Sequence, residues 1–469
     1  MTITPISLGT GSSPSRFAAG GAARAINCYL ERQGDEAKAP EIMVACDGLT
    51  AFAALPTYPV RAMLEVGTYL YVVAGRVMYR VDTLGNYTVL GNVPTDGIVT
   101  MVRNRRTNPQ IGIVSERLYY VYDTVDGSFE RITVSDVTDF YPTSITILDG
   151  YGILPVSSSR WYATELDDLA TVDGLSFGSA ESDPDEIVMS ATREGEVVIF
   201  GTQTTEFFQD TGDETFAFTR SQAIRLGCLA GGSVANIDRT LAWVAHDGTV
   251  RLLSGYGGER ISDHAVERAI AGVDPSELRA TTWWGRGHTF YVLSSDSWTW
   301  AYDLATGKWH ERKSYQSSRW MIAEVARYGL QLIAGGNDSG DLYVMSGDAY
   351  DEDGEPLVMT VQTPPVHAAP YRLGFNALFV DIVPGVGLAD GSTQDVTPEL
   401  MVSWSDNGGQ TWSAERRVSL GRLGEMTKRA VVRRLGVSNQ IGRTFKISIS
   451  AAVSRGLLGL SADVEKLAA

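Results

Sequence analysis

The chain has 469 residues, which is enough for two or three domains or for one large β domain with a smaller partner. Hydrophobic residues make up 44% and charged residues 20%, a composition that indicates a globular protein and excludes a mainly disordered one. The formal net charge at pH 7 is -17. A chain this acidic lacks the basic footprint that a sequence-reading DNA-binding protein needs.

The charge is unevenly distributed along the chain. Residues 356–469 hold 12 Lys+Arg against 9 Asp+Glu, whereas residues 1–355 hold 27 against 47. An acidic body repels phosphates, so this part of the chain suits a surface past which DNA slides without sticking.

The first residues, MTITPISLGTGSSPSRF, contain no basic segment followed by an apolar stretch, and no later run reaches the ~20 apolar residues that span a bilayer. We therefore expect neither a signal peptide nor a membrane span. The three cysteines, Cys28, Cys46 and Cys228, are too few and too scattered for a disulfide framework or a structural zinc site. We expect them to be buried thiols.

Short β-rich runs separated by Gly, Asp and Asn turns fill residues 57–350, where helical periodicity is almost absent. Strand–turn–strand units begin at Tyr79, Tyr120, Trp243 and Trp300, and in each an Asp/Gly turn joins two strands. Units recurring about every 40 to 60 residues are typical of four-stranded propeller blades. The sequence predicts an all-β chain with a propeller of about six blades, closed by pairing of strands distant in the chain.

A polar, turn-rich segment, DAYDEDGEPL, follows the predicted propeller and marks a boundary. Beyond it, NALFVDIVPG, ELMVSWS and TFKISISAAV read as strands of a smaller, sandwich-like β domain. We predict an irregular N-terminal segment at 1–56 that packs on this C-terminal domain, a propeller at 57–350 and the C-terminal domain at 356–469. Asp351, Asp353 and Glu355 are candidate calcium ligands or part of a solvated acidic loop, but they lack the later bidentate Glu of an EF-hand.

No catalytic motif is visible. The five histidines lie outside any HExxH or GxSxG setting, and no phosphate-binding loop occurs. His288, at a predicted strand start, is expected to pack or to hydrogen-bond. The 56 acidic residues leave a pair of glycosidase carboxylates possible on sequence alone. We predict a protein that is not an enzyme and has no cofactor and no metal.

The stretch SWSDNGGQTW resembles the Asp-box of sialidases, Ser-x-Asp-x-Gly-x-Thr-Trp. The residues that match or replace the pattern are Ser405, Asn407, Gly409, Thr411 and Trp412, with Asn407 in place of the aspartate and Asp406 one position out of register. An Asn side chain hydrogen-bonds turn backbone, and Gly tolerates positive φ. We interpret the motif as a structural turn.

The segment from Arg416 to Arg434 carries seven basic residues against Glu425 alone. It is either a solvated hairpin face or a docking surface for an acidic neighbour, such as the next subunit's acidic body. Direct binding of single-stranded nucleic acid is disfavoured because no aromatic residues interleave with the arginines. The candidate docking residues are Arg416, Arg417, Arg422, Lys428, Arg429, Arg433 and Arg434.

Several long, ordered motifs carry a family resemblance. They are SFGSAESDPDEIVMSATREGEVVIFGTQTTEFFQDTG from Ser176, IRLGCLAGGSVANIDRTLAWVAHDG from Ile224, GYGGERISDHAVERAI from Gly255 and GHTFYVLSSDSWTWAYDLATGKWHER from Gly287. This succession resembles the packaged-DNA stabilisation proteins, or tail hub and nozzle proteins, of short-tailed bacteriophages. The resemblance covers most of residues 20–460.

The resemblance implies a structural protein of the virion tail, made in the bacterial cytoplasm, with a β-propeller body and no catalytic residues. It implies a homo-oligomeric ring, expected to be a hexamer, below the portal and adaptor proteins and next to a tail needle or to fibre or spike proteins. Such a ring retains the packaged genome and later forms part of the ejection conduit. Double-stranded DNA would pass through it without sequence-specific binding. The acidic charge of residues 1–355 leads us to expect that the body lines or flanks this channel.

Two other classes of function stay open on the sequence. One is a carbohydrate-binding or sialidase-like propeller that acts as a host-receptor adhesin, whose sugar-stacking side chains would come from Trp283, Trp284, Trp298, Trp300 and Trp309. The other is a monomeric protein-interaction propeller.

Overall fold

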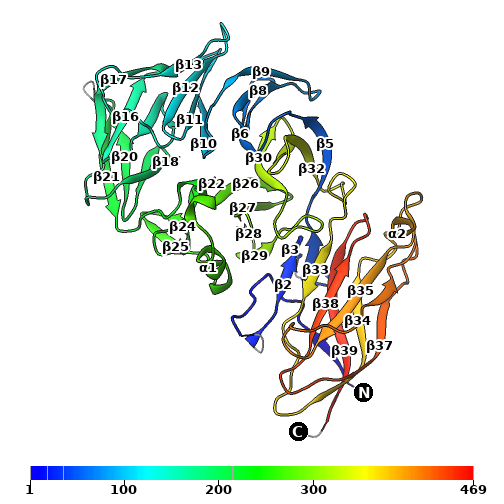
Figure 1. Cartoon of the computed structure of the whole chain (residues 1–469). Coiled ribbons are helices and arrows are strands. Elements are labelled where there is room, and N and C mark those ends of the chain that lie inside the picture. Colours follow the sequence, from blue (N-terminus) through cyan, green and yellow to red (C-terminus); the bar gives the residue numbers. More distant parts are fainter. Residues whose placement is uncertain (1, 18–19, 35, 214–215, 468–469) are drawn as a thin grey trace.

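The computed structural model describes the whole chain apart from residues 1, 18–19, 35, 214–215 and 468–469. Strands dominate, and they form two adjoining bodies, a β-propeller and a β-sandwich (Figure 1). The described residues contain only short helices: α1 (His264–Ile270), α2 (Thr393–Val396), η2 (Gly231–Ser233) and η3 (Pro275–Glu277). None of these helices has the length and apolar character needed to cross a membrane.

Within the described residues, seven four-stranded antiparallel blades make up the propeller. From the inner to the outer strand, blade 1 consists of β6 (Val60–Val66), β7 (Tyr69–Ala74), β8 (Val77–Val81) and β9 (Tyr87–Asn92), and blade 2 of β10 (Val99–Arg103), β11 (Gln110–Ser115), β12 (Leu118–Asp123) and β13 (Phe129–Ile132). Blade 3 consists of β14 (Thr146–Leu148), β15 (Tyr151–Pro155), β16 (Arg160–Glu165) and β17 (Asp168–Ser179), and blade 4 of β18 (Ile187–Arg193), β19 (Glu196–Gly201), β20 (Thr205–Asp210) and β21 (Phe218–Ile224). Blade 5 consists of β22 (Ala235–Ile237), β23 (Thr240–Val244), β24 (Val250–Ser254) and β25 (Gly257–Arg260), blade 6 of β26 (Arg279–Gly285), β27 (His288–Ser294), β28 (Thr299–Asp303) and β29 (Lys308–Glu311), and blade 7 of β30 (Ile322–Tyr328), β31 (Gln331–Gly336), β32 (Asp341–Ser346) and β5 (Gly48–Ala54).

The seventh blade closes the ring. Its outer strand β5 comes from the N-terminal part of the chain and pairs antiparallel with β32, with Val344 opposite Thr50 and Met345 opposite Leu49. The inner strands of successive blades contact one another around the ring, and β30 of blade 7 returns to β6 of blade 1. The predicted propeller of about six blades has seven within the described residues, because the inner strands begin only 39 to 48 residues apart, near the short end of the expected spacing. Its closing strand β5 lies in a segment that we had not assigned to the propeller.

The predicted Asp/Gly hairpin turns are confirmed at β8–β9, β12–β13, β23–β24 and β28–β29. In each turn one carboxylate oxygen accepts the backbone N–H two residues further on, at 2.8 to 3.0 Å, for the aspartates Asp82, Asp123, Asp247 and Asp303. A glycine with positive φ completes each turn, as at Gly307 (φ 69°).

The first 56 residues are not irregular as expected, because five strands form there. β1 (Thr2–Ile6), β3 (Cys28–Arg32) and β4 (Glu41–Ala45) belong to one sheet of the sandwich, in the order β3-β4-β39-β34-β37 with β1 on β39. β2 (Arg24–Ile26) belongs to the other sheet, and β5 to the propeller. The predicted boundaries at 57–350 and 356–469 stay a proposal, to which we add β5 as part of the propeller.

The sandwich is completed by the C-terminal strands β33 (Met359–Gln362), β34 (Leu373–Ile382), β35 (Glu399–Ser405), β36 (Arg416–Ser419), β37 (Ala430–Val437), β38 (Thr444–Ile449) and β39 (Gly456–Lys466). The buried faces of its two sheets share one apolar core that includes Leu378, Val402, Phe445 and Leu457. Alternating burial along β35 and β38 has the period of two expected for strands that cover a core with one face.

The two bodies are joined through β2. It pairs antiparallel with β33 of the sandwich and forms a parallel bridge, Ile26 to Glu311, with the outer strand β29 of blade 6, so one nine-stranded sheet runs through both bodies. The next residue, Asn27, has positive φ (55°), and its amide nitrogen donates to the carbonyl oxygens of Lys313 and Val358. These hydrogen bonds satisfy polar groups at the seam, where the propeller and the sandwich meet.

Leu49 offers a test of ring closure. Its side chain is fully buried on β5, whereas the neighbouring Thr50 is exposed. We expect Leu49→Ala to lower the free energy of unfolding by about 2–5 kcal/mol, because it leaves a cavity in the closing blade. Thr50→Ala, the matched control, should change it by less than about 0.5 kcal/mol. Denaturant unfolding measures both, and equal effects of the two changes would contradict the role of β5.

Candidate docking surface

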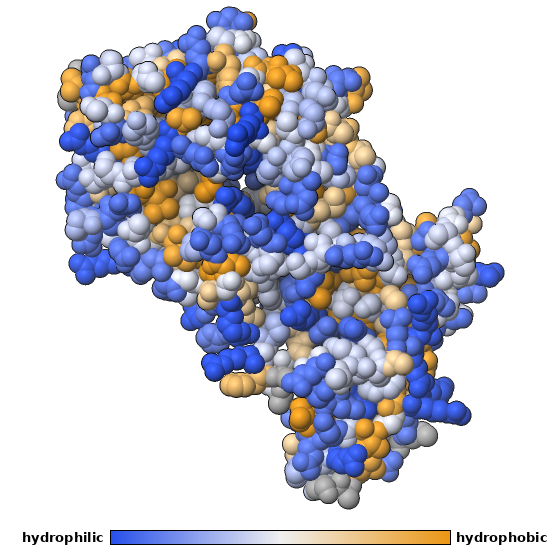
Figure 2. Space-filling view, viewed as in Figure 1, coloured by the Kyte–Doolittle hydropathy of each residue, from blue (hydrophilic) through white to orange (hydrophobic). Residues whose placement is uncertain are grey.

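The seven basic residues predicted from the sequence are all exposed and lie on one side of the sandwich. They come from β36, from β37 and from the loop that joins these strands. We call the set the basic surface: Arg416, Arg417, Arg422, Lys428, Arg429, Arg433 and Arg434. In Figure 2 this outer side of the sandwich is largely hydrophilic.

The basic surface covers two open sheet edges. β36 is the last strand of the nine-stranded sheet and β37 the last strand of the other sheet, and the two strands contact each other. Open edges expose unpaired backbone groups, and charged side chains along them block uncontrolled strand addition. Edge protection is therefore one role of this surface.

A β-bulge brings two neighbouring arginines to the same side of β37. The register with β34 shifts between Phe375 and Ala377, and Arg434 has positive φ (60°). As a result Arg433 and Arg434 both face solvent, while Leu435 turns back into the core. Sequence alternation alone would have placed one of the two arginines inward.

Some members of the basic surface are held by local contacts. Arg429 lies 3.6 Å from Asp381, Arg417 lies 3.4 Å from Glu415, and Arg416 donates to the carbonyl oxygen of Arg433. Within the described part of the chain, no side-chain hydrogen bond or ion pair engages the other members, which are Arg422, Lys428, Arg433 and Arg434. Their positive charges are available to a partner.

The Asp-box-like segment forms the loop after β35. The Ser405 hydroxyl accepts the N–H of Gly409 at 2.8 Å, and Asn407 Oδ1 accepts the N–H of Thr411 at 2.9 Å. Asn407 Nδ2 donates to the Thr411 hydroxyl at 2.8 Å, and Gly409 has positive φ (89°). Lys446 lies over the Trp412 ring, 4.6 Å from its centroid. The amide of Asn407 thus makes the backbone contact that an aspartate would make.

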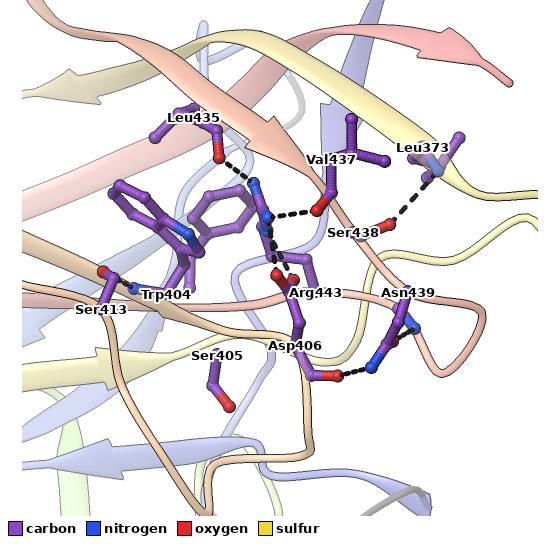
Figure 3. Close-up of polar contacts among 12 residues, drawn as sticks. Leu373, Trp404, Ser405, Asp406, Ser413, Leu435, Val437, Ser438, Asn439 and Arg443 are labelled. Carbon is purple, nitrogen blue, oxygen red and sulfur yellow. Dashed lines mark hydrogen bonds and ion pairs between the residues drawn. The ribbon is translucent and has the colours of Figure 1, made fainter.

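Asp406, set aside in the sequence as out of register, holds a buried cation. Its two carboxylate oxygens each accept from the Arg443 guanidinium at 2.7 Å, and this arginine is 1% exposed (Figure 3). Arg443 also donates to the carbonyl oxygens of Leu435 and Val437, at the bulged end of β37. Its guanidinium lies 4.8 Å from the Phe375 ring centroid. The pair ties the Asp-box-like loop to the strand that carries the basic surface.

A central cavity of about 390 Å³ lies where the inner strands of the propeller begin. Charged side chains that line it are Arg61, Asp96, Glu277, Arg279, Asp296, Arg319 and Glu324. Arg61 donates to the carbonyl oxygens of Gly75, Thr95 and Gly97 and so braces the first two blades. The Thr281 hydroxyl donates to the Glu324 carboxylate at 2.9 Å, and burial raises the pKa of Glu324 to about 7.

The remaining candidates carry structural roles. His288 begins β27 and pairs with buried Asp303 at 2.9 Å, as expected of a residue that hydrogen-bonds at a strand start. Cys28, Cys46 and Cys228 are confirmed as buried free thiols, and burial raises the pKa of Cys46 to about 11 and of Cys228 to about 12. Such thiols are poor nucleophiles at neutral pH.

The acidic segment after the propeller holds strands together. Asp353 accepts the backbone N–H of Ala51 in β5, and buried Glu352 accepts from the Trp320 indole at 2.8 Å. Among the described residues, no three His, Cys, Asp or Glu side chains lie together as a metal site.

Comparison with known proteins assigns the family. The family model described as "Bacteriophage P22 Gp10, beta-propeller" matches residues 37–350, and the model described as "Bacteriophage P22 Gp10, beta-sandwich" matches residues 359–465. The chain belongs to the P22 Gp10 family. Membership confirms the all-β class and the predicted family.

The curated relative that matches this P22 Gp10 family member is distant in sequence. Tail hub protein gp10 of Salmonella phage P22 is 24% identical over 229 residues, which are 45% of this chain and 46% of that protein. The chain thus aligns with about half the length of this curated relative. Among solved structures, the computationally designed Ika8 protein is 13% identical, with 63% of this chain and 99% of that chain covered and a TM-score of 0.38. A similarity this weak supports no argument about fold or function.

The neighbouring Asp406 and Asn407 provide a matched pair of variants. We expect Asp406→Asn to lower the free energy of unfolding by about 1–3 kcal/mol, because it leaves the buried Arg443 guanidinium without its carboxylate. Asn407→Asp completes the Asp-box pattern and keeps the oxygen that accepts from Thr411. It should change stability by less than about 0.5 kcal/mol. Thermal and denaturant unfolding of both variants measure these changes. A larger loss of stability for Asn407→Asp than for Asp406→Asn would show that the turn depends on the motif position, residue 407, instead.

Glu324 predicts a pH dependence of stability. A carboxyl with a raised pKa binds its proton more tightly in the folded state, so stability is lost as pH rises from the unfolded value of about 4.5 through the folded value of about 7. Glu324→Gln should therefore be more stable than the unaltered chain above pH 7, by about 1–2 kcal/mol, and its stability should vary less between pH 4.5 and 7.5.

Unfolding curves across that pH range measure the effect of Glu324→Gln. The exposed Glu194→Gln serves as the control, and its curve should parallel that of the unaltered chain. A Glu324→Gln curve that also runs parallel to the unaltered chain would exclude Glu324 as the titrating group.

Proposed function

We propose that the chain is the tail hub subunit of a short-tailed phage, which assembles as a ring below the portal and adaptor proteins. Membership of the P22 Gp10 family across both bodies carries this proposal, since the matched models cover residues 37–350 and 359–465. The curated relative is itself described as a tail hub protein. Six copies would form the ring, and needle, fibre or spike proteins would contact it.

The ring retains packaged DNA and forms part of the ejection conduit. The formal charge of -17 supports this role, because an acidic wall repels the phosphates of a passing duplex and prevents it from lodging. Within the described residues, the only groove in which a candidate sugar-stacking ring is strongly exposed lies beside Trp284 in blade 6. A DNA conduit does not require a groove with an exposed aromatic ring.

The alternative function, a host-receptor adhesin, finds less support in the side chains. Of the five candidate sugar-stacking rings, Trp283, Trp300 and Trp309 are buried in blade cores, and Trp298 is half-buried. Trp284 is 57% exposed, but the Arg327 guanidinium lies 5.0 Å from its ring centroid. A stacking platform for a glycan would need several exposed rings in one groove.

Cryo-electron microscopy of intact particles, or of the chain mixed with its portal and adaptor, tests the proposal. We expect a ring of this chain on the portal axis, with an acidic lumen. Density confined to peripheral appendages would overturn the hub and favour the adhesin. A ring with a neutral or basic lumen would keep the hub and reject the acidic wall.

A further inference from the structure

The acidic charge of the propeller is concentrated in three blades. Residues 99–224, which form blades 2 to 4, hold 21 Asp+Glu against 8 Lys+Arg. Their net charge of -13 is most of the acidic excess of residues 1–355. The other four blades are much closer to neutral.

Part of this charge lies on the outer strands and turns of blades 2 and 3. The loop after β13 lies against β17, because a Cβ at Gly174 would be 3.5 Å from the Asp136 Cβ. Six exposed carboxylates of these two blades are engaged by no ion pair within the described part of the chain. We call the set the acidic rim: Asp126, Glu130, Asp136, Glu165, Asp173 and Glu181.

The acidic rim and the basic surface lie at opposite ends of the molecule. Figure 1 shows β13, β17 and β21 at one end and β37 at the other, with blades 5 to 7 and the seam between them. The two surfaces of one copy therefore cannot meet. Several charges on each surface are left without a partner of opposite charge, and the molecule carries a charge dipole along its long axis.

We propose that neighbouring copies of the chain join head to tail, with the basic surface of one copy on the acidic rim of the next. This contact rests on the proposed ring and identifies the surfaces that build it. It uses two different patches on each subunit, so it is heterologous and closes into a ring when the rotation between copies allows. Association through like ends would set equal charges against each other.

Each subunit retains a formal charge of -17 because association neutralises the rim with charges that the same chain supplies. Among the basic residues, Arg422, Lys428 and Arg433 suit the role best, since none has a side-chain partner of its own in the described structure.

Charge reversal distinguishes two roles of the basic surface, the head-to-tail contact and the protection of open sheet edges. Glutamates protect an open sheet edge as lysines and arginines do, so a reversed surface stays guarded and loses only its complementarity. The basic-reversed variant carries Arg422→Glu, Lys428→Glu and Arg433→Glu. The rim-reversed variant carries Glu130→Lys, Asp136→Lys and Asp173→Lys.

The assay is ring formation by the full chain on its portal and adaptor, counted by electron microscopy. We expect each reversed variant to lower the yield of rings roughly tenfold or more, and the chain that carries both sets to recover it. A control with Lys38→Glu, Arg239→Glu and Lys308→Glu makes the same charge change as the basic reversal at exposed positions outside both surfaces, and should assemble normally. Thermal unfolding confirms that every variant is folded.

Zero-length carbodiimide cross-linking of the unaltered ring gives an independent readout. The chain has only six lysines, and Lys428 is the one that lies in the basic surface. We expect it to join Glu130, Asp136 or Asp173 of a neighbouring copy. Raising the ionic strength should weaken this cross-link, because exposed charge pairs are screened.

The outcomes separate the two proposals. If the unaltered chain forms no ring, the proposed function fails. If the ring forms but both reversed variants assemble normally, or the doubly reversed chain does not recover, the head-to-tail contact is wrong and the hub stands. Normal rings of the basic-reversed variant that have lost binding to a double-stranded DNA fragment would assign the basic surface to DNA instead, and would also overturn the contact.

Discussion

Residues 24–54 bind the propeller and the sandwich into one molecule. In sequence order, β2 bridges blade 6 and the sandwich, β3 and β4 complete a sandwich sheet, and β5 closes the seventh blade. Neither body is complete without strands from this segment, so their stabilities are coupled. The seam at Asn27 shows the physical requirement: a residue with positive φ lets the chain turn between two sheets, while its amide satisfies carbonyl groups from both sides. The separation of the acidic and basic ends depends on this joint, because it fixes the direction in which the sandwich projects from the propeller.

The propeller and the sandwich support their charged surfaces in different ways. Neighbouring blades pack against each other through apolar clusters that lie between them. Their outer strands can therefore carry charged side chains without removing apolar residues from the core. In the sandwich, the buried Arg443 anchors the bulged end of β37 to Asp406, and the bulge in turn directs Arg433 and Arg434 outward. A buried ion pair contributes little net stability but defines one arrangement of the chain. In this sandwich, that arrangement keeps Arg433 and Arg434 exposed along the edge strand β37.

The sequence predicted the features that depend on local chemistry. Aspartate followed by glycine specified hairpin turns, and the same hydrogen bond from an aspartate oxygen recurs at Asp82 and Asp303. The closing strand of blade 7 was missed because β5 lies roughly 290 residues from its partner β32, and no local pattern records a pairing over that distance. The exposure of the seven basic residues followed from their charge, but the bulge at Arg434 did not, since an arginine with positive φ has no compositional signal. Asp406 was dismissed for its register within a motif, although its partner Arg443 lay outside the motif altogether.

Blade closure by β5 has a consequence for biosynthesis. This strand leaves the ribosome early, yet its partner β32 follows only after about 290 further residues. At typical bacterial rates of synthesis the delay is roughly 15 to 60 s. Throughout that interval β5, which carries the apolar Leu49, has no partner strand, while blades 1 to 6 form in order beside it. The nascent chain is therefore open to aggregation until nearly three quarters of it has been made, and a chaperone that shields the N-terminal segment would protect it during this interval.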